Sequence, residues 1–129
     1  SMPRRYLRYA VRLNSGVRLQ IMSIVIFDKD EDAYLAWIHQ HPEGFVLNRR
    51  RGGLSKNYLM LHTPGCALIS TYTQMAQPGG FTTRKYIKVC SQSLADLRSY
   101  VRAECGRIDK SFTGKCKKCS PNAGTPAAT

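Results

Sequence analysis

The segment YLMLHTPGC at residues 58–66 and the segment CKKC at residues 116–119 decide how this chain folds. The first segment ends with a histidine and a cysteine on either side of a Pro-Gly turn, and the second has two cysteines in the CxxC spacing. A structural zinc site needs four nitrogen or sulfur ligands in a tetrahedron. Because two ligands across a tight turn make half of such a site, the two segments together predict one zinc site that fixes the fold. The predicted ligands are His62, Cys66, Cys116 and Cys119.

The chain has five cysteines, an odd number, and no secretory signal precedes them. A disulfide framework is therefore not expected, and the protein is expected to reside in the reducing cytoplasm. Cys105 falls on the apolar side of a predicted helix, where a buried thiol is expected. Cys90 ends a predicted strand and is expected to be packed, although it is also the alternative to His62 as the fourth ligand. A redox CxxC would sit at a helix start near a βαβ unit, and no such pattern surrounds residues 116–119.

The composition is strongly basic. Lys and Arg number 20 against 8 Asp and Glu, for a formal net charge of +12, and 43% of the residues are hydrophobic. This hydrophobic content is enough for a core and excludes a disordered chain, and no apolar run is long enough to span a bilayer. The balance favours a small domain with an anionic partner, most commonly nucleic acid.

The pattern along the chain predicts two helices and three to four short strands. Acids at residues 30–32 precede apolar residues at helical spacing, and a second helix is expected from Ser93, as its cap, to about Cys105, with Gly106 as its stop. Because helices do not alternate with buried strands, the predicted class is α+β: a small antiparallel sheet of three to four strands with two helices and a structural zinc site. The predicted strands are 45–48, 58–62, 66–71 and 84–90.

Three regions are expected. Residues 1–21 hold five arginines and no acid and form a basic N-terminal extension, since Met22 opens a segment that resembles a natural start. The spacing in this extension also allows two strands around Asn14-Ser15-Gly16, and its charge also suits a transit peptide. Residues 22–121 are expected to form a single zinc-stabilised α+β domain, and residues 122–129, which are small, polar and Pro-containing, a disordered tail.

The C-terminal half resembles the metal-binding module of the Ada DNA-repair protein and its short relatives. The stretch GKCKKCSP at 114–121 is similar to the closing turn of that module, and residues 58–66 are similar to a variant with histidine as the first ligand, found on some bacterial nucleases. The gap between the two halves is longer here. The resemblance implies a zinc fold and contact with the DNA backbone, but not methyl transfer, because His62 stands where the repair protein has its methyl-accepting cysteine. Residues 44–50 with 58–62 also resemble a set of bacterial proteins, a likeness that implies no function.

The function expected from these features is a zinc-stabilised nucleic-acid-binding domain that contacts the backbone of DNA, rather than RNA, through a basic surface. Two alternatives remain open: a small nuclease or toxin-like enzyme, for which His39, His41 and Glu43 are the only catalytic group on offer, and an adaptor that binds an acidic protein. An enzyme is the less favoured class, because carboxylates are few. Phosphate contacts are expected from basic residues in the loop at 49–56, the predicted strand around 85–88 and the cysteine turn at 115–118. They are Arg49, Arg50, Arg51, Lys56, Lys85, Lys88, Lys115, Lys117 and Lys118.

Overall fold

Strands β3 (Phe45–Arg50) and β5 (Tyr86–Ser91) form the middle of a six-stranded sheet in the computed structural model, which describes residues 4–13, 16–52 and 55–121. The strand order is β1-β2-β5-β3-β4-β6, and every neighbouring pair is antiparallel except the parallel pair of β4 and β6. The α+β class and the two helices are as predicted, but the sheet has more strands than the three to four expected. The remaining strands are β1 (Arg4–Leu13), β2 (Gly16–Phe27), β4 (Leu59–His62) and β6 (Gly114–Lys115).

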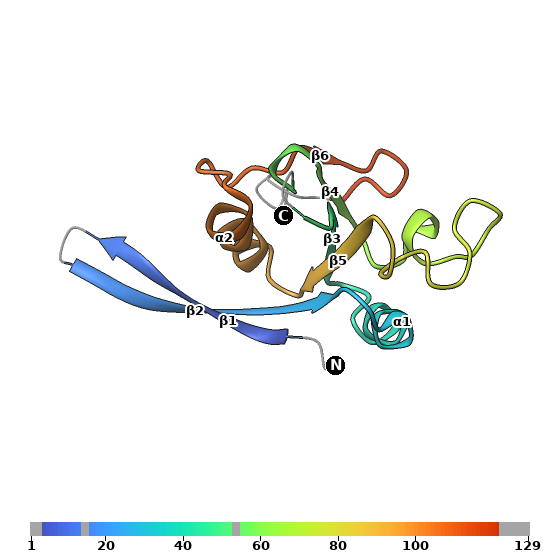
Figure 1. Ribbon diagram of the computed structural model, residues 1–129, viewed down its shortest axis with the longest axis horizontal. Coiled ribbons are helices and arrows are strands. Elements are labelled where there is room, and N and C mark those ends of the chain that lie inside the picture. Colours follow the sequence, from blue (N-terminus) through green and yellow to red (C-terminus); the bar gives the residue numbers. More distant parts are fainter. Residues whose placement is uncertain (1–3, 14–15, 53–54, 122–129) are drawn as a thin grey trace.

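The β1–β2 hairpin accounts for most of this difference. Its strands pair in register from Tyr6 opposite Ser23 to Leu13 opposite Gly16, and the hairpin projects from the rest of the fold (Figure 1). β2 continues without interruption through position 22, and its last three residues pair with β5. The two-strand reading of the first residues is therefore confirmed. The turn at residues 14–15 and the predicted tail at 122–129 lie outside the described residues.

The two helices begin and end where local chemistry predicts. Asp30 caps α1 (Glu31–Gln40), and its carboxylate accepts a hydrogen bond from the backbone N–H of Ala33 at 2.9 Å. Ser93 caps α2 (Leu94–Cys105) in the same way, and Gly106 ends α2 in the left-handed conformation, with φ 72°.

Asp96 stands three residues after the Ser93 cap, where an acid can return a hydrogen bond to the cap residue. Its carboxylate does not turn back to the Ser93 N–H but accepts a hydrogen bond from the backbone N–H of Ser23, at 2.9 Å. The side chain thus ties α2 to β2 across the fold, a long-range contact that the local spacing could not reveal.

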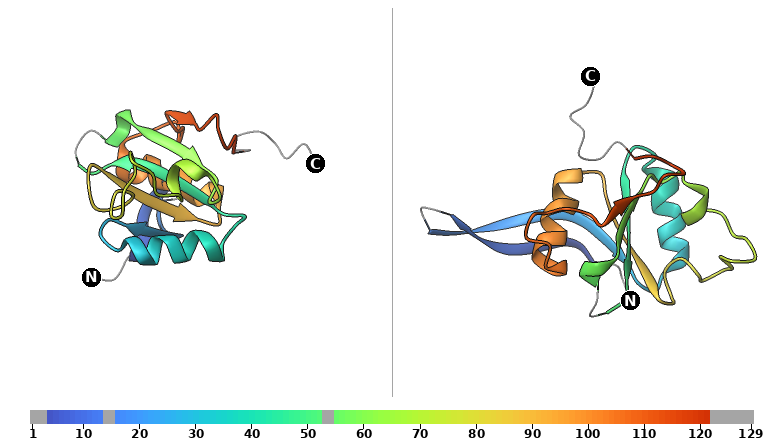
Figure 2. Two further views of the ribbon diagram at one scale, coloured as in Figure 1. Left: turned by 90° about the vertical axis from the view of Figure 1, so that its right-hand side faces the viewer. Right: turned by 90° about the horizontal axis from the view of Figure 1, so that it is seen from above.

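The sheet lies between two layers, with α2 on one face and α1 on the other (Figure 2). The core between α2 and the sheet includes Leu47, Leu61, Leu97 and Val101, all fully buried. On the other face, Val46 packs in a second core with apolar residues of α1 and of the long connection between β4 and β5. Because side chains alternate along a strand, every second residue of β3, β4 and β5 faces the α1 side.

The predicted strand at 66–71 is wrong. Cys66 instead precedes a short 3-10 helix, η2 (Ala67–Ile69), after a turn in which the Cys66 N–H donates to the Thr63 carbonyl at 3.1 Å. The Ser70 hydroxyl also donates to the Cys66 carbonyl, at 2.7 Å. These local bonds fold the segment back toward the C-terminal cysteines, so turn formation overrides the pattern that favoured a strand.

Candidate metal centre

His62, Cys66, Cys116 and Cys119 come together on the α1 side of the sheet. Their ligand atoms all lie within 4.8 Å of one another, and the Cys66 and Cys116 sulfurs are 4.0 Å apart. His62 Nδ1 lies 4.0 Å from the Cys119 sulfur. Tetrahedral Zn–S bonds of about 2.3 Å place ligand atoms about 3.8 Å apart, so these spacings are close to those of a four-coordinate site. The four residues could hold a metal ion, as their sequence spacing predicted.

Secondary structure brings the two halves of this cluster together. His62 is the last residue of β4, and Cys116 follows β6, which pairs in parallel with β4. The Cys116 N–H extends that pairing by donating to the Leu61 carbonyl at 2.9 Å. On the other side, the Thr63 N–H donates to the Cys119 sulfur at 3.3 Å. The β4–β6 pairing thus aligns two turns that are more than fifty residues apart, and backbone N–H groups support the thiolate that a metal would require.

The protonation states of these side chains also bear on metal binding. Burial, together with the nearby charge of Lys88, lowers the pKa of His62 to about 4, so its imidazole is neutral near pH 7 and free to ligate. Burial raises the pKa of Cys66 to about 12, so its thiolate needs a compensating positive charge. Burial acts to raise the pKa of Cys116 as well, but backbone N–H groups of Cys119 and Lys118 outweigh it and lower that pKa. None of the five cysteines forms a disulfide, and a metal ion would supply the positive charge that two buried thiolates and the half-buried Cys119 thiolate lack.

The remaining cysteines lie elsewhere. Cys105 is 4% exposed and packs in the core under α2, as predicted. Cys90 is fully buried and belongs to no metal-binding group in the described part of the chain. The structure therefore brings His62, and not its alternative Cys90, to the cluster.

The basic residues predicted to contact phosphate fall into two groups. Arg49 donates to the Tyr100 hydroxyl at 2.6 Å, and Arg51 donates to the backbone carbonyls of Asp28 and Arg84, at 2.8 and 2.7 Å. These two arginines hold the fold together. Exposed side chains with no hydrogen-bond partner in the described part of the chain form the second group, and they are free to meet a ligand. They are Arg50, Lys56, Lys85, Lys117 and Lys118. Lys115 is exposed as well.

Lys88, which the sequence predicted as a phosphate contact together with Lys85, does not share a face with it. Lys85 precedes β5 and is exposed, whereas Lys88 is 3% exposed and points into the α1 side. Its ammonium donates to the Phe81 carbonyl at 2.6 Å and to Asn48 Oδ1 at 2.9 Å. Residues three apart in a strand lie on opposite faces, so the buried lysine cannot reach a phosphate at the surface.

The burial of Lys88 predicts a rise in stability at high pH. Burial lowers the pKa of Lys88 to about 8, against 10.5 in an unfolded chain. Between these values the unfolded chain keeps a proton that the folded chain has lost, so the free energy of unfolding increases with pH, by roughly 3 kcal/mol in full. Urea unfolding at pH 8 and pH 10 should show this increase in the wild type and not in Lys88→Met. The difference between the free energies of unfolding of the two proteins removes the titration of the cysteines, which both share. An equal pH dependence of the two proteins would contradict the lowered pKa of Lys88.

The histidines of the enzyme alternative do not form a site. His41 ends α1, stacks on Trp37 with ring centroids 4.3 Å apart, and has Nδ1 2.9 Å from the Trp37 carbonyl oxygen. His39 and Glu43 are exposed. In the described residues the His/Cys cluster is the one group that brings together three or more side chains able to bind a metal.

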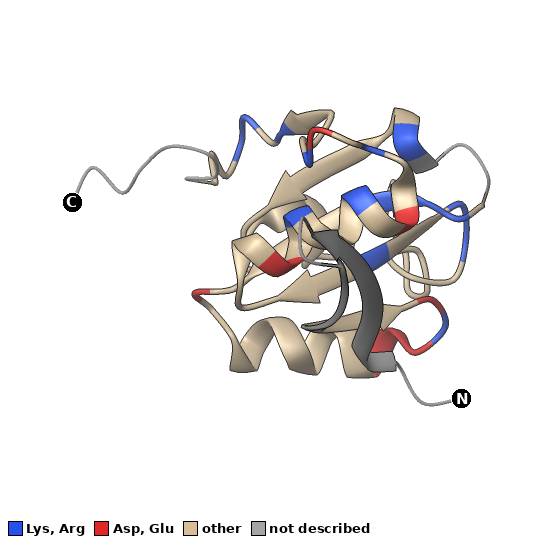
Figure 3. Ribbon diagram, turned by 90° about the vertical axis from the view of Figure 1, so that its left-hand side faces the viewer, with Lys and Arg blue, Asp and Glu red and all other residues tan. Residues whose placement is uncertain are grey.

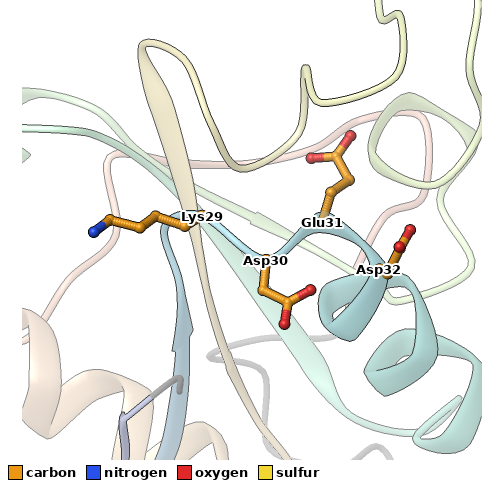
Figure 4. A pocket seen from close by; sticks show the side chains of 4 residues that line it. All are labelled: Lys29, Asp30, Glu31 and Asp32. Atoms are coloured by element: carbon orange, nitrogen blue, oxygen red, sulfur yellow. The ribbon is translucent and has the colours of Figure 1, made fainter. Parts of the chain in front are cut away.

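Glu31 is an anchoring residue that the sequence reading assigned only to helix capping. Its carboxylate is 9% exposed and accepts hydrogen bonds from the Thr82 N–H at 2.8 Å, the Thr82 hydroxyl at 2.9 Å and the Phe81 N–H at 3.3 Å. The Tyr72 hydroxyl donates to it as well, at 3.1 Å. Glu31 also borders an open pocket at the start of α1, where its side chain points away from that of Asp30 (Figure 4). No sequence signal separates Glu31 from its acidic neighbours.

No family model, curated protein or solved structure matches this chain. The expected resemblance to the Ada module is therefore supported only in the coarser sense that the four residues form a cluster that could bind a metal ion. No helix in the described residues has the length and apolar character needed to cross a membrane.

Proposed function

We propose that this chain is a zinc-stabilised nucleic-acid-binding domain that contacts the sugar-phosphate backbone, most readily of DNA, through its exposed basic side chains. The observation that carries the proposal is a set of exposed cations without a side-chain partner among the described residues: Arg50, Lys56, Lys85, Lys117 and Lys118. Charges that stabilise a fold are engaged with it, as Arg49 and Arg51 are, whereas these five side chains make no such contact within the part of the chain that the structure describes. A net charge of +12 attracts a polyanion over the whole surface.

The arrangement of charge agrees with this proposal. Lys and Arg are spread over the loops around β3, η1 (Ser55–Asn57) and the C-terminal turn, while several of the acids gather at the start of α1 (Figure 3). The CxxC turn carries two lysines between its cysteines, and the cluster that holds this turn to β4 fixes where they lie. Zinc is the metal proposed, because one imidazole and three thiols in a closed, largely buried group are typical of structural zinc sites.

The salt dependence of binding tests this function. Each phosphate contact contributes about 0.9 to the slope of log K against log salt concentration on duplex DNA. Replacing Arg50 and Lys85 together by glutamine should therefore weaken binding of a labelled duplex and reduce the slope by about 1 to 2. Fluorescence anisotropy between low and moderate salt measures both quantities.

Arg102→Gln, compared with the single replacement Arg50→Gln, provides a control matched in charge. Arg102 is exposed on α2, so its loss changes the net charge and leaves the proposed surface intact. Its slope should stay closer to that of the wild type. Polyglutamate added as a competitor tests the adaptor alternative, which predicts that the acidic polypeptide displaces DNA. If the protein fails to bind nucleic acid at low salt, the proposal is wrong.

A further inference from the structure

We propose that the end of the sheet near Tyr58 and Tyr86 binds unpaired bases of a single-stranded nucleic acid by stacking. This inference rests on the proposed function and names the form of nucleic acid that it selects. The recognised chemistry is an unpaired base on a sugar-phosphate chain, which single-stranded DNA and RNA share. Aromatic side chains bind such bases because every base has a π-face, whereas the bases of a duplex cover one another.

The strand register places the two tyrosines on the same face of the sheet, on either side of β3. Tyr86 opens β5 and pairs with Arg50 of β3, while Met60 of β4 pairs with Asn48 of β3. Tyr58 directly precedes β4, and residues two apart in an extended chain share a face, so Tyr58 falls in a row with Arg50 of β3 and Tyr86 of β5. This row lies on the α1 side of the sheet, two residues along each strand from the row of Asn48.

The two tyrosines lie side by side, and neither is fully buried. Their ring centroids are 5.3 Å apart with planes at 60°, and each residue is half-buried, so neither is closed off from solvent. Burial raises the pKa of Tyr58, and a hydrogen bond with the Asn48 side chain acts against this rise. Asn48 is itself oriented, because its Oδ1 accepts from buried Lys88 and its amide NH₂ is left for the Tyr58 hydroxyl. The chain of contacts from Lys88 through Asn48 thus holds Tyr58 in place before a ligand arrives.

Charge around the two rings fits a polyanion. Arg84 and Lys85 directly precede Tyr86, and Lys56 lies two residues before Tyr58, all with exposed side chains. The position of Arg50 lies between those of the two tyrosines in the row, and its side chain has no hydrogen-bond partner in the described residues. Bases stacked on the tyrosines therefore leave their phosphates among free cations, the combination that single-strand-binding surfaces use.

Tyr72 is an exposed aromatic residue that lacks flanking cations. Tyr72 is 39% exposed, but its ring stacks on Phe81 with centroids 5.1 Å apart. It lies in residues 67–83, which contain no Lys, Arg, Asp or Glu. Because no cation flanks it in sequence, Tyr72 is a matched control for a solvent-facing tyrosine without phosphate-binding neighbours.

Anisotropy titrations with labelled oligo-dT, oligo-U and a mixed-sequence duplex, each of about 12 nucleotides or base pairs, test the inference. Tyr58→Leu and Tyr86→Leu keep an apolar side chain but remove the π-face, and each should weaken single-strand binding by roughly tenfold without changing the salt slope. Tyr86→Phe and Tyr72→Leu should bind as the wild type does. Tyr58→Phe keeps the π-face and loses only the hydrogen bond with Asn48, so it should weaken binding much less than Tyr58→Leu. The oligo-dT and oligo-U titrations decide between DNA and RNA. Metal content and circular dichroism of each variant confirm that it is folded.

Photo-crosslinking gives a readout that a purely structural role would not change. An oligonucleotide carrying 4-thiothymidine should crosslink to Tyr58 or Tyr86, as located by mass spectrometry of the digested protein. Leucine variants that bind oligo-dT and oligo-U like the wild type would overturn the inference. Binding of duplex alone, insensitive to these variants, would remove stacking and leave the proposed function standing. Absence of binding to any of the three probes at low salt would remove both.

Discussion

Replacing Cys116 by serine is expected to abolish stoichiometric metal binding and to unfold the C-terminal turn. Structural zinc contributes about 10 to 16 kcal/mol of apparent binding free energy in zinc-finger peptides, and this energy is part of the folding free energy. In this chain the last segment is tied to β4 by a two-residue strand and the four-residue cluster. We expect the free energy of unfolding to fall by at least about 3 kcal/mol, which lowers the melting temperature by roughly 10 °C or more.

The measurements are metal content by mass spectrometry and thermal unfolding by circular dichroism. A chelator added to the wild type should reproduce the loss of stability and should have little further effect on Cys116→Ser. Cys105→Ala is the matched control, because Cys105 is an equally buried thiol in the other core. It should keep its metal and lose only about 1 kcal/mol. A Cys116→Ser protein with full metal content and an unchanged melting temperature would contradict the ligand assignment.

Replacing Glu31 by alanine is expected to produce the second large effect. The carboxylate is the acceptor for two backbone N–H groups and one hydroxyl in the buried Phe81-Thr82 pair, and removing it leaves these donors unsatisfied. Each unsatisfied buried donor costs about 1 to 3 kcal/mol, so a loss of roughly 3 kcal/mol or more is expected. The connection between β4 and β5 would then be released from the start of α1.

Urea unfolding of the metal-saturated protein measures this loss, and hydrogen exchange at Phe81 and Thr82 locates it. Asp32→Ala is the matched control, because Asp32 occupies the same first turn of α1 but is exposed. Its removal should cost well under 1 kcal/mol, the size of a surface charge near a helix N-terminus. Equal stabilities of the two variants would show that Glu31 acts only through the helix dipole.

Local patterns predicted much of the fold and of the metal site. Asp30, Ser93 and Gly106 mark the helix ends because capping is satisfied by groups a few residues away. The four candidate ligands could be predicted from their spacing along the chain, since one turn presents two ligands to a metal and two such turns complete a four-coordinate site. The strand at 66–71 was wrong because the bonds from Cys66 to Thr63 and Ser70 serve a site completed by distant residues.

The sequence by itself determined the α+β class, the two helices, the four side chains that could hold a metal ion and the excess of positive charge, because each depends on composition or on neighbours within a turn. Only the tertiary structure decided which charges are free. It buries Lys88 against Phe81 and Asn48, engages Arg49 with Tyr100, and leaves Arg50 beside two tyrosines. It also places Glu31 against a segment about fifty residues away. These outcomes depend on which strands pair and in what register, which is set by the burial of whole faces of the sheet rather than by any short stretch of sequence.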